Sequence, residues 1–162
     1  MKTALVTGAS RGLGKAIAIE LVRDHGFHIL INYTSNQEAA QDTLDQITAL
    51  GGTAELMKFD VQEKVQVDAA LVTWEEQNPD GFIYLLVNNA GITRDGLFMW
   101  MPEKDWDDVI NISVKGFFNV TQPLVAKMLR KRQGKIVNVA SLSGLKGVGG
   151  QTNYSAAKGA VI

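Results

Sequence analysis

Short, nearly continuous apolar runs alternate along this chain with stretches in which apolar residues recur every three or four positions. Continuous runs are typical of strands buried on both faces of a parallel sheet, and the three-to-four spacing is typical of amphipathic helices. The runs predict strands at about 4–6, 28–33, 54–59, 83–87 and 135–140. The spaced pattern predicts helices at about 13–25, 37–50, 63–77, 102–132 and 155–162.

Local signals indicate where several of these elements begin and end. Asn36 is a favourable N-cap for the second helix, and Gly26 closes the first. Pro102 suits the first position of the long helix, although Met101 before it offers no side-chain cap. Pro123 lies inside the same pattern, so we expect it to kink or interrupt that helix.

Strands that alternate with helices are joined by right-handed crossovers and form a doubly wound parallel sheet. Ligands of such sheets bind beyond the carboxyl ends of the strands, where the strand order reverses. A polar cluster follows each predicted strand, at 7–14, 32–35, 60–61, 88–91 and 141–143. The sequence therefore predicts one α/β domain of the Rossmann type, residues 1–162, with its ligand site at this edge.

Composition and charge narrow the class of protein. The 162 residues are 46% hydrophobic, which supports a globular core, and the net charge of -1 gives no basic field for nucleic acid or an anionic membrane. The absence of cysteine excludes disulfides and thiolate chemistry. No apolar stretch approaches the roughly 20 residues of a membrane span, and the first run is too short for a signal peptide. We expect a soluble, cytoplasmic protein with no nucleic-acid or membrane partner, and we predict no metal site.

Three glycines follow the first strand with the spacing Gly8-x-x-x-Gly12-x-Gly14. Such a loop lets the chain turn sharply and leaves room for a pyrophosphate, which the free N–H groups of the next helix then face. The spacing differs from the G-x-G-x-x-G fingerprint and from the P-loop. On its own it is also compatible with a simple turn.

Further motifs make the chain resemble the short-chain dehydrogenase/reductases. The matching positions are 7–14 (TGASRGLG), Asp60, 88–91 (NNAG), Asn111, Ser141, Tyr154 and Lys158, in the order expected along nearly the whole chain. Within that family, 92–95 (ITRD) and 150–154 (GQTNY) are most similar to 3-oxoacyl-acyl-carrier-protein reductases and acetoacetyl-CoA reductases.

The resemblance implies a catalytic group made of Asn111, Ser141, Tyr154 and Lys158. Tyr154 and Lys158 are four residues apart on a predicted helix, so both lie on one face, where the ammonium favours the phenolate. Tyr154 would exchange a proton with the carbonyl oxygen of the substrate, and Ser141 would hydrogen-bond that oxygen. Asn111 would hold a water that links Lys158 to solvent. Without the resemblance, a surface Tyr–Lys pair, a loop serine and a polar helix residue are the alternatives.

The resemblance also implies a dinucleotide site, in which Asp60 contacts the adenine and Lys158 the ribose. Capping of the third helix is the alternative for Asp60. We expect NADP(H), because the second strand ends without a carboxylate and Arg11 can pair with a 2′-phosphate. The predicted cofactor-binding residues are Gly8, Ser10, Arg11, Gly12, Leu13, Gly14, Thr34, Asp60, Val61, Asn88, Ala90, Gly91, Tyr154 and Lys158.

The expected reaction is the NADPH-dependent reduction of a 3-oxoacyl thioester on acyl carrier protein to a 3-hydroxyacyl thioester, by a homotetramer. Reduction of acetoacetyl-CoA or another ketone is one alternative, and a nucleotide-binding module without turnover is another. Arg130 and Arg132 either dock the acidic carrier or form a solvated helix end. Because the family continues beyond Ile162, we expect a longer protein, with a true fragment as the alternative.

Overall fold

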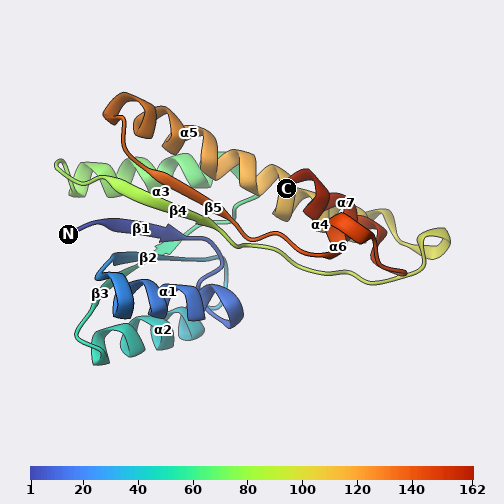
Figure 1. Ribbon diagram of the computed structural model, residues 1–162, viewed down its shortest axis with the longest axis horizontal. Coiled ribbons are helices and arrows are strands. Elements are labelled where there is room, and N and C mark those ends of the chain that lie inside the picture. The colour runs from blue at the N-terminus through green and yellow to red at the C-terminus, as the bar shows by residue number, and fades with distance from the viewer.

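Five parallel strands form the sheet at the centre of the structure, a computed structural model that describes all residues, 1–162. Their order across the sheet is β3-β2-β1-β4-β5, so the direction of winding reverses between β1 and β4 (Figure 1). The strands are β1 (Thr3–Val6), β2 (His28–Tyr33), β3 (Thr53–Lys58), β4 (Ile83–Asn88) and β5 (Lys135–Asn138). The doubly wound parallel fold predicted from the sequence is confirmed.

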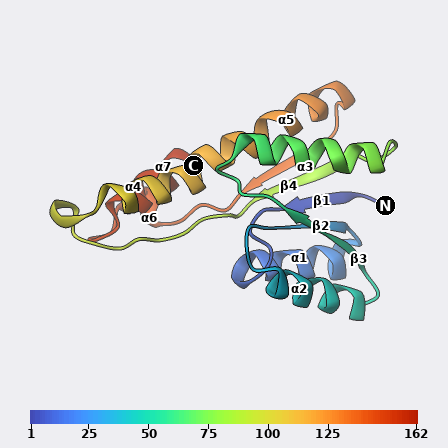
Figure 2. The ribbon, with the colours of Figure 1, turned by 180° about the vertical axis from the view of Figure 1, so that it is seen from behind.

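Helices cover both faces of this sheet, with α1 and α2 on one side and α3 and α5 on the other (Figures 1 and 2). The α-helices are α1 (Gly12–His25), α2 (Gln37–Ala49), α3 (Lys64–Gln77), α4 (Glu103–Ile110), α5 (Gly116–Lys131), α6 (Ser143–Lys146) and α7 (Thr152–Ala160). A 3₁₀ turn, η1 (Phe98–Trp100), precedes α4, and a π-helical turn, η2 (Asn111–Lys115), joins α4 to α5. No helix combines the length and the apolar character that crossing a bilayer requires.

The central strands are buried on both faces, as their continuous apolar runs predict. In β1, Leu5 packs into the core under α3 and α5, while Ala4 and Val6 pack into the core under α1 and α2. All three side chains are fully buried. The sheet is therefore held between two separate hydrophobic layers, which leaves its carboxyl edge as the place where polar loops gather.

The strand β5 differs from the expectation of a buried strand. It pairs only with β4, and all four of its residues are exposed, including Ile136 at 36% and Val137 at 49%. The physical reason is its place at the edge of the sheet, where the described helices do not cover it. An apolar run therefore predicted the strand correctly but not its environment.

The predicted interruption at Pro123 is wrong. Pro123 lies inside the continuous helix α5, where Val120, Leu124 and Met128 are buried against the sheet and hold the helix in place. This packing offsets the one main-chain hydrogen bond that proline removes. The irregularity comes earlier, at η2, where the Gly116 N–H donates to the Asn111 carbonyl five residues back.

Two boundary predictions are confirmed. The Asn36 side chain accepts a hydrogen bond from the Ala39 N–H at 2.9 Å, which caps α2, and α1 ends at Gly26 in the left-handed region. The start of α4 has no side-chain cap, as the sequence around Met101 and Pro102 indicated.

Candidate active site

The ends of β1 and β4 are tied together by Thr7 and two residues that follow β4. The Thr7 hydroxyl donates to the Val87 carbonyl and accepts from the main-chain N–H groups of Asn89 (2.9 Å) and Ala90 (3.0 Å). The Asn89 carboxamide in turn donates to the carbonyls of Thr7 (2.9 Å) and Gly8 (3.3 Å). These bonds fix the glycine loop and the loop after β4 side by side at the point where strand order reverses.

The glycine loop is closely packed at Gly14, while Gly12 lies in open space with a left-handed backbone. A Cβ at Gly14 would collide with the Asn89 amide and the Gly8 carbonyl. Behind the loop, the buried Asn32 carboxamide accepts from the Gly8 N–H at 3.1 Å and donates to the carbonyls of Met57 and Phe59. The loop is thereby held open toward solvent by its neighbours, a preformed cradle for a phosphate group.

A cleft of about 650 Å³ runs along this carboxyl edge. Eleven of the predicted cofactor-binding residues line it: Gly8, Ser10, Arg11, Gly12, Leu13, Gly14, Thr34, Asp60, Val61, Ala90 and Gly91. Residues that follow four different strands thus converge on one groove, in the size range of small-molecule sites. Asn88, Tyr154 and Lys158 do not line this cleft.

The cleft contains one cation and one carboxylate. Arg11 precedes α1 in an extended conformation, and its guanidinium forms no hydrogen bond or ion pair with the chain. Asp60 accepts hydrogen bonds from the main chain and the side chain of Gln62. The helix α3 starts later, at Lys64, so Asp60 does not cap it. An anionic group entering the cleft near Arg11 would therefore meet an uncompensated positive charge.

Lys158 lies beside the inner end of the cleft, at Gly91. Its side chain is buried, with only 5% of the residue exposed, and its ammonium donates to the Val139 carbonyl at 2.7 Å. A Cβ at Gly91 would lie 3.6 Å from Lys158 Nζ and 3.6 Å from the Ser113 Oγ. Burial lowers the pKa of Lys158 below that of an ordinary lysine, because the charged form is taken out of water.

Tyr154 lies on α7, and Ser141 lies just before α6, the helix that packs on α7. Tyr154 and Lys158 both belong to α7, and the ammonium lies 5.8 Å from the centre of the Tyr154 ring. The short helix α6 begins just after Ser141 and packs on α7 at Gly144, where a Cβ would lie 2.6 Å from the carbonyl carbon of Lys158. This close approach requires glycine and places the loop that contains Ser141 next to α7.

Asn111 begins η2, the π-helical turn that packs against α7. It lines neither the cleft nor a second cavity of about 10 Å³ beside Lys158, a volume on the scale of one water molecule. Ser113 lines that cavity, and its buried hydroxyl has no hydrogen-bond partner in the chain. Asn88 also lines it, with its carboxamide donating to Thr121 and Asn138.

The sequence contained a signal for Ser113 that apolar periodicity misses. Small residues three apart, Ser113 and Gly116, mark the side of a helix that passes close to another segment. A Cβ at Gly116 would lie 2.7 Å from a Val61 methyl group, so this position has no room for a larger residue. Across the chain, no three His, Cys, Asp or Glu side chains are grouped in a way that could hold a metal ion.

The chain is similar to known proteins in both sequence and structure. A sequence profile of the family described as short chain dehydrogenase matches residues 2–162. The chain belongs to the short-chain dehydrogenase family. It is 43% identical over 161 residues to the 3-oxoacyl-(acyl-carrier-protein) reductase of Staphylococcus aureus (strain Mu50) and 40% identical over 162 residues to that of Aggregatibacter actinomycetemcomitans.

A solved structure of this family shows the same fold. The gluconate 5-dehydrogenase of Burkholderia cenocepacia J2315, in complex with NADP and tartrate, superposes with a TM-score of 0.90 at 35% identity. The match covers 99% of this chain and 61% of that one. The chain likewise spans 64% of the length of the Staphylococcus aureus relative and 66% of the Aggregatibacter relative. Membership of the short-chain dehydrogenases and the Rossmann-type sheet are thus confirmed.

The burial of Lys158 predicts a specific pH dependence of stability. Because its pKa is lowered in the folded protein, the unfolded chain binds more protons between the folded and the unfolded pKa values. The stability of the wild type relative to Lys158→Met should therefore rise as pH increases from neutrality toward the ordinary lysine range. Thermal unfolding of both proteins over a pH series measures this, and the subtraction removes all other titrating groups. A difference in Tm that falls or stays constant with rising pH would contradict the prediction.

Proposed function

We propose that this short-chain dehydrogenase is an NADP(H)-dependent ketoreductase that reduces a 3-oxoacyl thioester, carried by acyl carrier protein, to the 3-hydroxyacyl thioester in fatty acid synthesis. The observation that carries the proposal is the position of Lys158 beside Gly91, which lines the cleft, with the Tyr154 ring centre 5.8 Å from the same ammonium. A proton donor next to a dinucleotide groove suits the reduction of a carbonyl group. The two named reductases support the choice of substrate.

The cleft fits NADP(H). Gly14 has no side chain, so the loop leaves space for a pyrophosphate against its backbone. The unpaired Arg11 offers a partner for a 2′-phosphate. At the end of β2 the cleft is lined by Tyr33, Thr34 and Ser35, none of which is a carboxylate that would repel that phosphate. The bound nicotinamide supplies the hydride, and the NADP complex of the structural relative supports this cofactor.

The chain's own residues move the proton and hold the reacting oxygen. The Tyr154 phenol donates its proton to the ketone oxygen as the carbonyl carbon accepts the hydride, so the C=O bond becomes C–OH. Ser141 donates a hydrogen bond to the same oxygen. The Lys158 ammonium favours the phenolate that remains and hydrogen-bonds the nicotinamide ribose. Reprotonation from solvent is the role predicted for Asn111, but Ser113 is the residue whose hydroxyl reaches the cavity beside Lys158.

Replacing Tyr154 tests the reaction directly. Tyr154→Phe removes the proton donor, so kcat for NADPH oxidation on acetoacetyl-CoA should fall about 10²-fold or more, with the Kd for NADPH within about twofold. Tyr84→Phe is the matched control, because its ring stacks near Phe27 far from the cleft and its hydroxyl forms no hydrogen bond in the chain. That control should keep full activity.

The alternatives give different outcomes in the same assay. Turnover of acetoacetyl-CoA or another ketone, with none of a carrier-bound 3-oxoacyl thioester, would assign another substrate to the same chemistry. NADPH binding without turnover of any ketone would assign a nucleotide-binding module. Equal activity of wild type and Tyr154→Phe would refute the catalytic role.

The cofactor preference depends on Arg11. Arg11→Ala should raise the KM for NADPH about tenfold to a hundredfold, the range expected for one charge-assisted hydrogen bond, and leave the KM for NADH nearly unchanged. Lys15→Ala is the matched control, since Lys15 is also a cation on α1 but pairs with Asp42 outside the cleft. A wild type that prefers NADH would overturn the NADP(H) proposal.

Arg130 and Arg132 support docking of an acidic carrier protein. Arg132 is the one non-glycine residue in the chain with a positive φ (51°), although glycine is favoured at this helix end. The pair lies at the end of α5 opposite the catalytic group, a helix about 24 Å long by its 16 residues. We therefore assign these charges to steering of the carrier rather than to positioning of the reacting ketone.

A substitution that tolerates the left-handed backbone tests this steering. Arg132→Asn should raise the KM for carrier-bound substrate several-fold at low salt, with kcat unchanged and the difference shrinking as salt rises. A neutral N-acetylcysteamine thioester of the same acyl group is the control substrate and should be unaffected. An unchanged KM for the carrier-bound substrate would leave the two arginines as a solvated helix end.

We also propose assembly as a homotetramer. Phe118 (54% exposed) and Leu129 (72% exposed) lie on the outer side of α5 and support a subunit contact along this helix.

A further inference from the structure

A buried carboxamide lies directly before Tyr154 in the chain. Asn153 is 0% exposed, although it sits in the first turn of a helix next to the site. A buried amide destabilises the fold unless its donors and its acceptor find partners. The partners of Asn153 are therefore informative about what this residue does.

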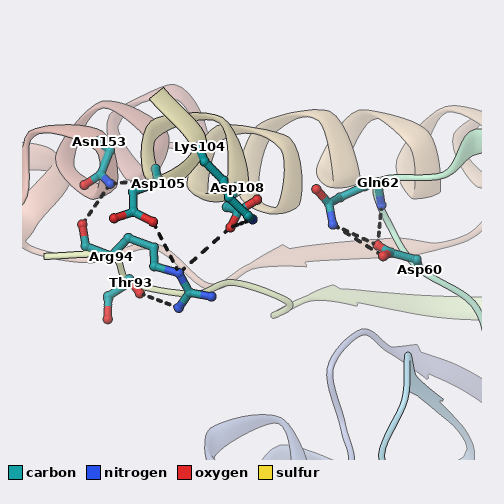
Figure 3. A network of polar contacts seen from close by, with 8 residues as sticks. All are labelled: Asp60, Gln62, Thr93, Arg94, Lys104, Asp105, Asp108 and Asn153. Carbon is teal, nitrogen blue, oxygen red and sulfur yellow. Dashed lines mark hydrogen bonds and ion pairs between the residues drawn. The ribbon is translucent and has the colours of Figure 1, made fainter. Parts of the chain in front are cut away.

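All three partners are main-chain groups from three separate segments. Asn153 Nδ2 donates to the carbonyls of Arg94 at 2.9 Å and of Asp105 at 3.1 Å, and Oδ1 accepts from the Tyr154 N–H at 2.7 Å. Carbonyls only accept and an N–H only donates, so a single orientation of the carboxamide satisfies all three bonds. Figure 3 shows Asn153 reaching from α7 toward Arg94 and Asp105.

The bond to Tyr154 meets a need of the helix itself. The first N–H groups of a helix have no carbonyl partner within it. In α7 the Ser155 N–H is bonded to the Gln151 carbonyl at 2.7 Å, while Gln151 provides no side-chain cap for the turn. The Asn153 side chain therefore takes the place of the missing acceptor for the N–H of Tyr154.

The other two bonds tie this turn to the walls of the site. Arg94 follows Gly91 and Ile92, which line the cleft, and Asp105 belongs to the first turn of α4. Two further bonds join the loop after β4 to the residues just before α7. The Gly96 N–H donates to the Gly150 carbonyl (2.8 Å), and the Gln151 side chain donates to Asp95 (3.0 Å).

Arg94 has further anchors of its own. Its guanidinium lies 3.9 Å from carboxylate oxygens of both Asp105 and Asp108, and Lys104 pairs with Asp108 at 2.6 Å (Figure 3). The Asn153 carboxamide is the fully buried member of this network, in which Asp105 and Asp108 are partly buried and Arg94 and Lys104 are exposed.

We propose that Asn153 is a positioning residue for Tyr154: its carboxamide fixes the first turn of α7 against the loop after β4 and against α4, and thereby sets where the phenol meets the ketone. The proposal rests on the proposed function, in which Tyr154 is the proton donor. Because proton transfer requires a defined geometry, a loosened first turn lowers the rate of the chemical step without changing the dinucleotide groove.

The test compares Asn153→Ala and Asn153→Asp with Ser155→Ala. The alanine variant removes all three bonds, and the aspartate keeps the shape and the acceptor but loses the paired N–H donors. Ser155 is the matched control, since its buried hydroxyl forms no hydrogen bond in the chain and it adjoins Tyr154 on the same helix.

Both Asn153 variants should lose about 10- to 100-fold in kcat for NADPH oxidation on acetoacetyl-CoA, with the Kd for NADPH within about twofold of wild type. Ser155→Ala should stay within about twofold in both quantities. A second measurement does not depend on turnover: amide hydrogen exchange in residues 152–155 should accelerate at least tenfold in Asn153→Ala, while exchange in the glycine loop stays unchanged.

Three results would overturn the proposal. The first is a folded Asn153→Ala with wild-type kcat. The second is a parallel loss of kcat and NADPH binding, which indicates general damage. If the alanine variant does not fold, Asn153→Asp is judged by the same criteria. The third is unchanged exchange in 152–155. A wild type without ketone turnover would refute the proposed function alone, and exchange would still decide the role of Asn153.

Discussion

The structure depends on one buried exchange of hydrogen bonds, between Thr7 at the end of β1 and the turn that follows β4. The hydroxyl of Thr7 accepts from two successive main-chain N–H groups, and the Asn89 carboxamide returns two bonds to the glycine loop. Two loops more than 80 residues apart in sequence are thereby fixed at atomic distance. The cleft adjoins this junction, since Gly8, Asn89 and Ala90 line it, and Lys158 approaches the next residue, Gly91.

The cleft and the surroundings of Lys158 differ in their exposure to solvent. The cleft is open and lined by backbone, so it can bind a large anion through N–H groups and one free arginine. The surroundings of Lys158 are closed, and there its buried ammonium has one main-chain carbonyl as its hydrogen-bond partner. Removing water around Lys158 strengthens its field at the Tyr154 ring and at the same time makes its charge easier to lose.

Much of the cleft could be predicted from sequence, because its residues are encoded locally. A glycine loop after an apolar run, or a polar cluster at a strand end, gives its position without knowledge of the rest of the fold. The helix from Glu103 to Lys131 was harder. Apolar residues at every third or fourth position predicted a long helix there, whereas Ser113 and Gly116, which line the small cavity beside Lys158, are small residues that this pattern passes over. Asn111 was predicted from the family resemblance, whereas nothing in the apolar pattern pointed to Ser113. The partners of Asn153 could not be predicted at all, since Arg94 and Asp105 reach it only through tertiary packing.

The π-helical turn η2 has a consequence for the relation between α4 and α5. One residue more than a regular turn is accommodated between the two helices, which run on as a single rod in Figure 1. Each residue of an α-helix advances the side-chain direction by about 100°. The additional residue therefore acts as an angular offset: α4 can face the first turn of α7, while α5 faces the sheet and α3. Without that offset, a single straight helix could not both complete the hydrophobic core and support the helix that carries Tyr154.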